Sequence, residues 1–176
     1  RRPVRFPPSI PNRDPAPADV PLSARRLREL ADAERLILWA LRHRVAQGDP
    51  ASPHLVNAFD LLCGPAAGAR ARAALARLVD GLETFARRPL AFLDWSNDAL
   101  TADEATLLVL CAEAEIGGPT PAGLDALVVA EGAATTREAV RALVHHLAAA
   151  GLQLPPPVPT TPMREHDVAD HPFAVH

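Results

Sequence analysis

The chain is short of several residue types, and each shortage excludes a class of protein. It has no tyrosine, no lysine, two cysteines and one methionine among 176 residues. Cys63 and Cys111 lie far apart in apolar runs, which predicts small buried side chains rather than the disulfide framework of a secreted scaffold. No apolar run approaches the ~18 residues of a membrane span, and no apolar signal segment follows the first residues. We therefore expect a cytoplasmic protein.

Sequence signatures of enzymes and metal sites are also missing. The chain has no glycine-rich phosphate loop, no Gly-x-Ser-x-Gly elbow, no His-Glu-x-x-His and no Cys-x-x-Cys. Glu34 lies within an apolar helical face, where it either acquires a raised pKa or pairs with an arginine of a neighbouring helix. Imidazole and carboxylate donors gather near the end of the chain, without a cysteine or a fixed helical spacing to support zinc binding: His166, Asp167, Asp170, His171 and His176. We expect no catalysis, no cofactor and no metal site.

Proline divides the chain into three parts. Of its 19 prolines, 7 precede Ser23 and 6 follow Gly151. Proline fixes φ and removes a backbone donor, so these segments cannot extend helices or enter the interior of a sheet. We therefore predict an arginine- and proline-rich arm over 1–22, a helical domain over 23–154 and a proline-rich tail over 155–176.

The central part reads as all-α, with about six helices in a single bundle. We expect a first helix from Ser23 to Gly48, then helices from Pro53 to Cys63, from Pro65 to Pro89, from Thr101 to Ile116, from Pro121 to Ala130 and from Thr135 to Ala150. Apolar residues recur at helical spacing within each segment, and serine, threonine, proline or glycine stands at most of the ends. Thr101 and Thr135 each precede a glutamate by three residues, the spacing of a capping box. The paired carboxylates Asp103 and Glu104 are expected to lie in solvent at a helix end. The connection 90–100 carries Phe92 and Trp95, which we expect to cover one end of the bundle.

Charge is unevenly distributed along the chain. Residues 1–47 contain 10 arginines and 5 acids, whereas residues 89–134 contain 8 acids and no arginine. The two halves either neutralise each other or bind charged partners. All 18 basic residues are arginine, which is typical of a GC-rich bacterial genome. Three of them, seven residues apart, are expected to line one side of the first helix: Arg28, Arg35 and Arg42.

The C-terminal third offers one resemblance to a known family. Residues 100–154 consist of a capping box, a Leu-Val-Leu run, a Gly-Gly-Pro turn and the run from Thr135 to Gly151. This layout resembles the three-helix part of winged helix-turn-helix domains, whose third helix enters the DNA major groove. The resemblance implies nucleic-acid contacts at Arg137, Arg141 and His145. A triple proline stands where the hairpin wing of that family would follow, and acids outnumber arginines in this third.

The main functional hypothesis is a non-catalytic helical protein that binds another protein chain, as an adaptor, regulator or accessory subunit of a homo- or hetero-oligomer. Extended proline-rich arms lose little conformational entropy on binding. We expect the arms and the first-helix arginines to make the contacts with the partner, through Arg1, Arg2, Arg5, Phe6, Ile10, Arg28, Arg35, Arg42, Val158, Met163 and Phe173. The alternative is a DNA-binding regulator that uses residues 100–154.

Overall fold

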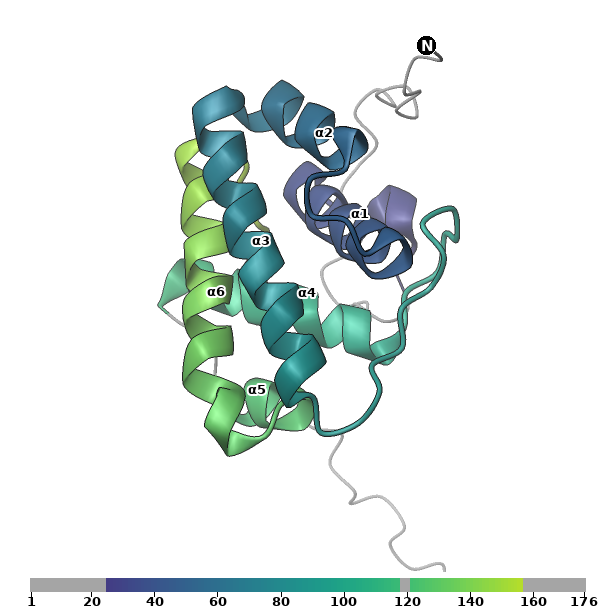
Figure 1. The fold of residues 1–176 in the computed structure, drawn as a ribbon, viewed down its shortest axis with the longest axis vertical. Helices are drawn as coiled ribbons and strands as arrows, with labels where there is room; N and C mark the ends of the chain where they lie inside the picture. The colour runs from purple at the N-terminus through teal and green to yellow at the C-terminus, as the bar shows by residue number, and fades with distance from the viewer. Residues whose placement is uncertain (1–24, 118–120, 157–176) are drawn as a thin grey trace, which may run out of the picture.

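Helices make up the regular structure of the computed structural model, which describes residues 25–117 and 121–156 (Figure 1). A short 3-10 helix, η2 (Leu27–Glu29), precedes six α-helices. These are α1 (Asp32–Gln47), α2 (Pro53–Cys63), α3 (Pro65–Phe85), α4 (Ala102–Ile116), α5 (Pro121–Leu127) and α6 (Ala130–Ala149). The predicted all-α bundle is confirmed, since no strand occurs within the described ranges. The two proline-rich arms lie almost entirely outside those ranges.

The longest helices, α3 and α6, lie side by side and run in opposite directions (Figure 1). They make the most extensive contact between any two elements, and α4 crosses behind them. Gly132, in the first turn of α6, packs directly on the ring of Phe85, and any larger residue at 132 would overlap that ring. Backbone hydrogen bonds fasten the same corner, where the Val129 amide donates to the Phe85 carbonyl at 2.9 Å.

Most helix ends coincide with the proline, glycine or capping residues that the sequence provides. Pro53 and Pro65 occupy first-turn positions, where a missing N–H has no consequence, and Gly64 separates the two helices with φ 76°. Thr101 forms the predicted capping box with Glu104: the Glu104 amide donates to the threonine hydroxyl at 3.1 Å. The helix that it opens ends at Ile116, as predicted.

Two predicted helix starts are wrong, and the third and fifth predicted helices end earlier than expected, at Phe85 and at Leu127. The expected first helix is interrupted at Leu30 and Ala31, which have extended backbone. Here Glu34 acts as a cap, because the Ala31 amide donates to its carboxylate at 2.8 Å; burial raises the Glu34 pKa and this bond opposes the rise. The second capping box does not form: α6 begins at Ala130, so Thr135 lies inside the helix, next to the fully buried Thr136.

The core contains mostly leucine and alanine. Phe59 is the one phenylalanine in the described ranges that is fully buried, and Cys111 is buried among leucines of α4. Small side chains allow the helices to approach closely, as at Gly68, where an added Cβ would lie 2.8 Å from the Phe59 carbonyl oxygen. The largest side chain enclosed by this core is an arginine, Arg42.

Candidate functional site

The connection between α3 and α4, residues 86–101, has no regular secondary structure, yet the bundle holds it firmly. Loops of this length inside a compact domain are uncommon and usually functional. Arg42 of α1 reaches into the loop with its side chain 0% exposed. Its guanidinium donates to both carboxylate oxygens of Glu104, at 2.7 and 2.9 Å, and to the backbone carbonyls of Asp94, Asn97 and Ala99. One side chain thus fixes the path of the loop from within.

A second carboxylate, Asp103, holds the beginning of the loop, where it leaves α3. It accepts from the Arg88 guanidinium at 2.6 and 2.9 Å and from the Ala91 amide at 2.8 Å. The hydrogen bond from Arg88 is the main cause that lowers the Asp103 pKa below its usual 3.8. Buried carboxylates are stable only when they are paired and hydrogen-bonded in this way. The first turn of α4 therefore supports the loop with two anions, Asp103 and Glu104.

Backbone amides alternate in direction along residues 90–93. The amides of Ala91 and Leu93 donate inward, to Asp103 and to Glu104 at 2.8 and 3.1 Å. The amides of Leu90 and Phe92 make no hydrogen bond with any described residue. This alternation is that of an extended strand with one edge occupied and the other edge free.

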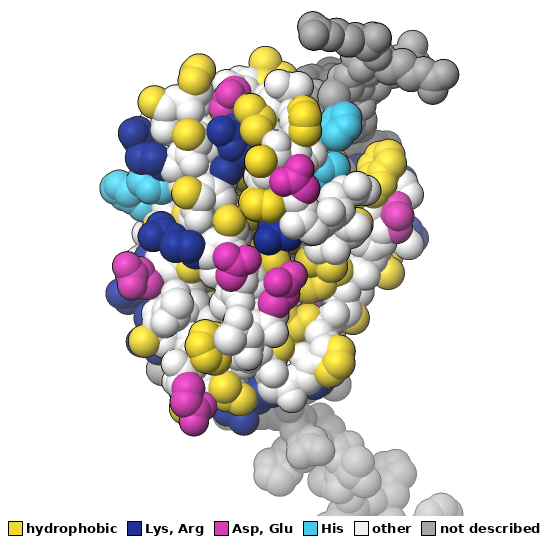
Figure 2. Space-filling view, in the orientation of Figure 1, with side chains coloured by type: hydrophobic (Ala, Val, Ile, Leu, Met, Phe, Trp, Pro, Cys, Tyr) yellow, Lys and Arg dark blue, Asp and Glu magenta, His cyan; other side chains and the backbone are white. Residues whose placement is uncertain are grey.

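An apolar groove of about 570 Å³ lies beside this free edge. Val79 and Leu82 of α3, both buried, form its floor. The other lining residues are Val45, Glu83, Ala86, Arg87, Arg88, Pro89, Leu90 and Phe92. In the space-filling view, apolar side chains gather between α3 and the loop to its right, with acidic side chains on the α3 side (Figure 2).

The ionic groups at the rim are nearly balanced. Arg88 is paired with Asp103, and Arg87 donates its Nε to the Val128 carbonyl at 3.1 Å. Glu83 is exposed and forms no ion pair with any described residue. Val45, 43% exposed, lies at the open side. The groove thus offers an apolar surface with weak charge selectivity, which suits an extended peptide better than a small charged metabolite.

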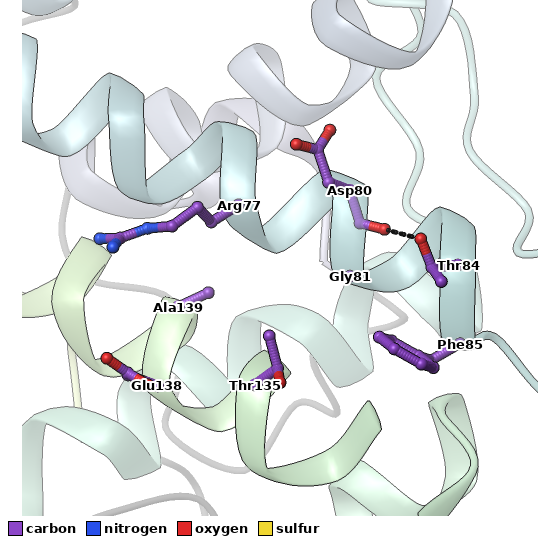
Figure 3. Close-up of a pocket in the computed structure, with 8 residues that line it drawn as sticks. All are labelled: Arg77, Asp80, Gly81, Thr84, Phe85, Thr135, Glu138 and Ala139. Atoms are coloured by element: carbon purple, nitrogen blue, oxygen red, sulfur yellow. Dashed lines mark hydrogen bonds between the residues drawn. The ribbon is translucent and has the colours of Figure 1, made fainter. Parts of the chain in front are cut away.

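A smaller hollow of about 280 Å³ lies between α3 and α6 (Figure 3). Charged and threonine side chains line it together with Gly81, Phe85 and Ala139. Figure 3 shows Arg77 extended over α6, Glu138 below it and the Asp80 carboxylate turned away from α6. Arg77 and Glu138 have no ion pair or hydrogen bond with any described residue.

A histidine cluster between α1 and α2 is the third group of reactive side chains. His43 Nε2 lies 2.9 Å from the Ser52 hydroxyl, and its ring stacks on Trp39 and meets His54 edge-on. Burial and the neighbouring His54 lower the His43 pKa. A serine–histidine contact is one element of nucleophilic catalysis, but no carboxylate among the described residues orients His43. Nothing further in the described ranges completes a catalytic site there.

The sequence placed three arginines on one exposed row, and the structure corrects this. Arg28 is exposed beside Asp98, and Arg35 forms an ion pair with Asp32. Arg42 is 1% exposed and holds the loop, so it is not available to a partner at the surface. The break before Asp32 separates Arg28 from the helix, and the loop 86–101 covers Arg42 although Arg35 of the same helix stays partly exposed. The predicted arm contacts lie outside the described residues: Arg1, Arg2, Arg5, Phe6, Ile10, Val158, Met163 and Phe173.

Two other expectations for this region are wrong. Trp95 is 53% exposed at the tip of the loop and covers no end of the bundle, although Phe92 does pack partly against the core. Asp103 and Glu104 look like solvated helix-end carboxylates in the sequence, but both are buried. The only sequence signal for Glu104 was its capping-box spacing, and that signal said nothing of Arg42, 62 residues away.

The nucleic-acid candidates lie on one helix. Arg141 and His145 are exposed on α6, whereas Arg137 is half-buried. Because α6 packs against α3, these side chains belong to a two-helix face rather than to a projecting helix (Figure 1).

The described residues thus define an all-α bundle with a rigid apolar groove. Within them no set of three histidine, cysteine or acidic side chains comes together that could bind a metal ion. No helix in those ranges has the length and apolar character needed to cross a bilayer. No family model, curated protein or solved structure matches this chain.

Proposed function

We propose that this chain is a non-catalytic protein–protein interaction protein: an adaptor, regulator or accessory subunit of a larger assembly. The observation that carries the proposal is the groove beside residues 89–93, whose wall is fixed from behind by buried ionic groups. A binding surface that is rigid before binding loses less entropy when it is occupied. Arg42, Asp103 and Glu104 all serve to hold the loop 86–101 in one conformation, as expected of a loop that forms the wall of a binding site.

The proposed occupant is an extended segment of a partner protein with apolar side chains at alternate positions. Such a segment pairs with the free amides of Leu90 and Phe92, as in strand addition to a sheet edge. Every second side chain then points into the groove, onto Val79 and Leu82, and each buried aliphatic side chain contributes about 1.5–3 kcal/mol. The weakly charged rim places few restrictions on the residues between them.

Residues 1–22 and 155–176 extend this proposal beyond the groove. We expect them to lie along the same partner, with Phe6, Ile10, Val158, Met163 and Phe173 as apolar anchors and Arg1, Arg2 and Arg5 on carboxylates. Proline-rich segments are suited to this because they are already extended before binding.

Photo-crosslinking followed by titration tests the groove. A photoreactive amino acid at Val45 in the full chain captures the partner in cells that produce it, and the identified partner is then purified and titrated. Val45→Glu is expected to weaken its binding at least tenfold, because the substitution places a charge at the mouth of an apolar groove. Leu61→Glu is the matched control, since Leu61 is 70% exposed on α2 and does not line the groove. Equal affinity for wild type and Val45→Glu would refute the proposed site.

The DNA-binding alternative has weaker support. Arg141 and His145 are exposed, but α6 is packed along α3 and Glu138 lies one turn from Arg141 on the same helix. A gel-shift series at increasing salt tests it, because phosphate contacts make affinity fall steeply with salt. A complex at low salt that Arg141→Ala weakens would favour this alternative.

A further inference from the structure

The outer face of α3 and α6 carries its charges in two separate halves. The Cβ position of Gly81 and the hydroxyl of Thr136, which would lie 3.2 Å apart, mark a point where the two helices touch. Towards the start of α3 and the end of α6, the exposed or half-buried ionisable groups are basic: Arg70, Arg77, Arg141, His145 and His146. Near and beyond that point, the exposed groups are mainly acidic: Asp80, Glu83, Glu131 and Glu138. Arg137, half-buried, is the exception in the acidic half.

The basic half has no internal counter-charge. Arg70, Arg77 and Arg141 form no ion pair with any described residue. The positive charges of Arg70 and Arg77 act together on His146, whose pKa is lowered by burial, by His145 and by these two arginines. Figure 2 shows histidine side chains at the left edge of this face with arginines above and below them. This half therefore presents a concentrated positive field that attracts an anionic surface.

The acidic half is equally short of partners. Glu83, Glu131 and Glu138 have no ion pair with any described residue, and Asp80 meets only Arg44, at 3.4 Å. The charge changes sign at a similar height on both helices, because Arg77 and Asp80 of α3 line the hollow of Figure 3 together with Glu138 of α6. A second copy of this face, rotated by 180° so that its two ends are exchanged, therefore places acidic groups opposite basic groups.

We propose that a second copy of this chain covers the α3–α6 face, related by a two-fold axis that lies in the interface and crosses both helices. That operation sets α3 against α3 and α6 against α6, antiparallel, with the basic half of each copy on the acidic half of the other. Arg77 then meets Asp80 of the second copy, and Arg141 meets the region of its Glu138. The other in-plane two-fold axis, parallel to the helices, would oppose like charges. Closed symmetric dimers need this kind of self-complementary patch.

The size and texture of the face suit such a dimer. A helix of 21 residues is about 31 Å long, and two adjacent helices about 10 Å apart give a footprint of roughly 600 Å². Two such footprints reach the lower end of the range for specific interfaces. Small exposed side chains along the face allow the two copies to approach closely: Ala66, Ala69, Ala73 and Ala134.

Analytical ultracentrifugation of the full chain tests the proposal. We expect a monomer–dimer equilibrium in the micromolar range at low salt, shifted towards monomer as salt rises. Arg77→Glu alone and Glu138→Arg alone should each weaken the dimer at least tenfold, because each places two like-charge contacts across the symmetric interface. An equimolar mixture of Arg77→Glu and Asp80→Arg should recover a heterodimer, because every contact between positions 77 and 80 then joins opposite charges.

Asp125→Arg serves as the matched control. Asp125 is exposed on α5, away from this face, so this variant should dimerise like wild type. A wild-type chain that stays monomeric at low salt would overturn the proposal. So would a dimer that Arg77→Glu and Glu138→Arg leave unchanged, because that dimer would use another surface. Circular dichroism of each variant distinguishes a lost interface from a lost fold.

Discussion

Replacing Arg42 by leucine should be among the most destabilising single substitutions in this chain. The substitution removes five hydrogen bonds at once, leaving the buried Glu104 carboxylate without its counter-ion and the carbonyls of Asp94, Asn97 and Ala99 without their donor. Removing one partner of a buried ion pair costs about 3–5 kcal/mol. Since a domain is stable by only about 5–15 kcal/mol, the loss is a large fraction of the total.

Urea unfolding followed by far-UV circular dichroism measures this loss. Arg35→Leu is the matched control: it removes an arginine of the same helix whose ion pair with Asp32 is exposed, and should cost no more than about 1 kcal/mol. Arg42→Lys keeps the charge but lacks the planar fork that reaches a carboxylate and several carbonyls together, so its stability should fall between wild type and Arg42→Leu. If Arg42→Leu and Arg35→Leu have similar unfolding free energies, the loop is not held as described.

Three further predictions concern the Arg88–Asp103 ion pair, the two cysteines and the N-terminal arm. Hydrogen bonding to Arg88 lowers the Asp103 pKa, so this pair should stabilise the fold above pH 3.8 and lose its effect as the pH falls below that value; acid titrations of wild type and Arg88→Gln should converge only at the acidic end. Burial raises the Cys111 pKa to about 12, whereas Cys63 is only half-buried. Mass spectrometry after alkylation should therefore find label on Cys63 in the folded chain, and label on Cys111 only after the chain is unfolded. Deleting residues 1–21 should weaken partner binding in a titration but leave the helical circular dichroism and melting nearly unchanged, and an unaltered affinity would remove the arm from the mechanism.

Local signals in the sequence were sufficient for most of the helices. Serine before Pro53, glycine at 64 and 117 and the capping box at Thr101 act within one turn of the backbone, so neighbouring residues determine the outcome. The box at Thr135 has the same spacing but does not start a helix. The residues before it are mainly alanines with high helix propensity, and the contact between Gly132 and Phe85 fixes an earlier start. Packing of Gly132 on Phe85 thus outweighed the capping-box spacing of Thr135 and Glu138.

The candidate site could not be predicted in this way. The Arg42 contacts join segments more than fifty residues apart, and no periodicity links them. In the sequence Arg42 has the spacing of an exposed row, because nothing there shows that the loop 86–101 will cover that part of the helix. The free edge at Leu90 and Phe92 depends on which amides the α4 carboxylates accept, a property of the folded chain alone.

The guanidinium of Arg42 also constrains the order of folding. Its acceptors come from α4 and from three points of the loop, while Arg42 itself belongs to α1. None of these segments can satisfy it separately, and the loop carries no hydrogen-bonded repeat that would form early by itself. The segment from Asp94 to Ala99 therefore needs both α1 and α4 in place, while residues 89–93 depend on α4 through Asp103 and Glu104. A nascent or partly unfolded chain presents no groove, which restricts recognition to molecules that have completed folding.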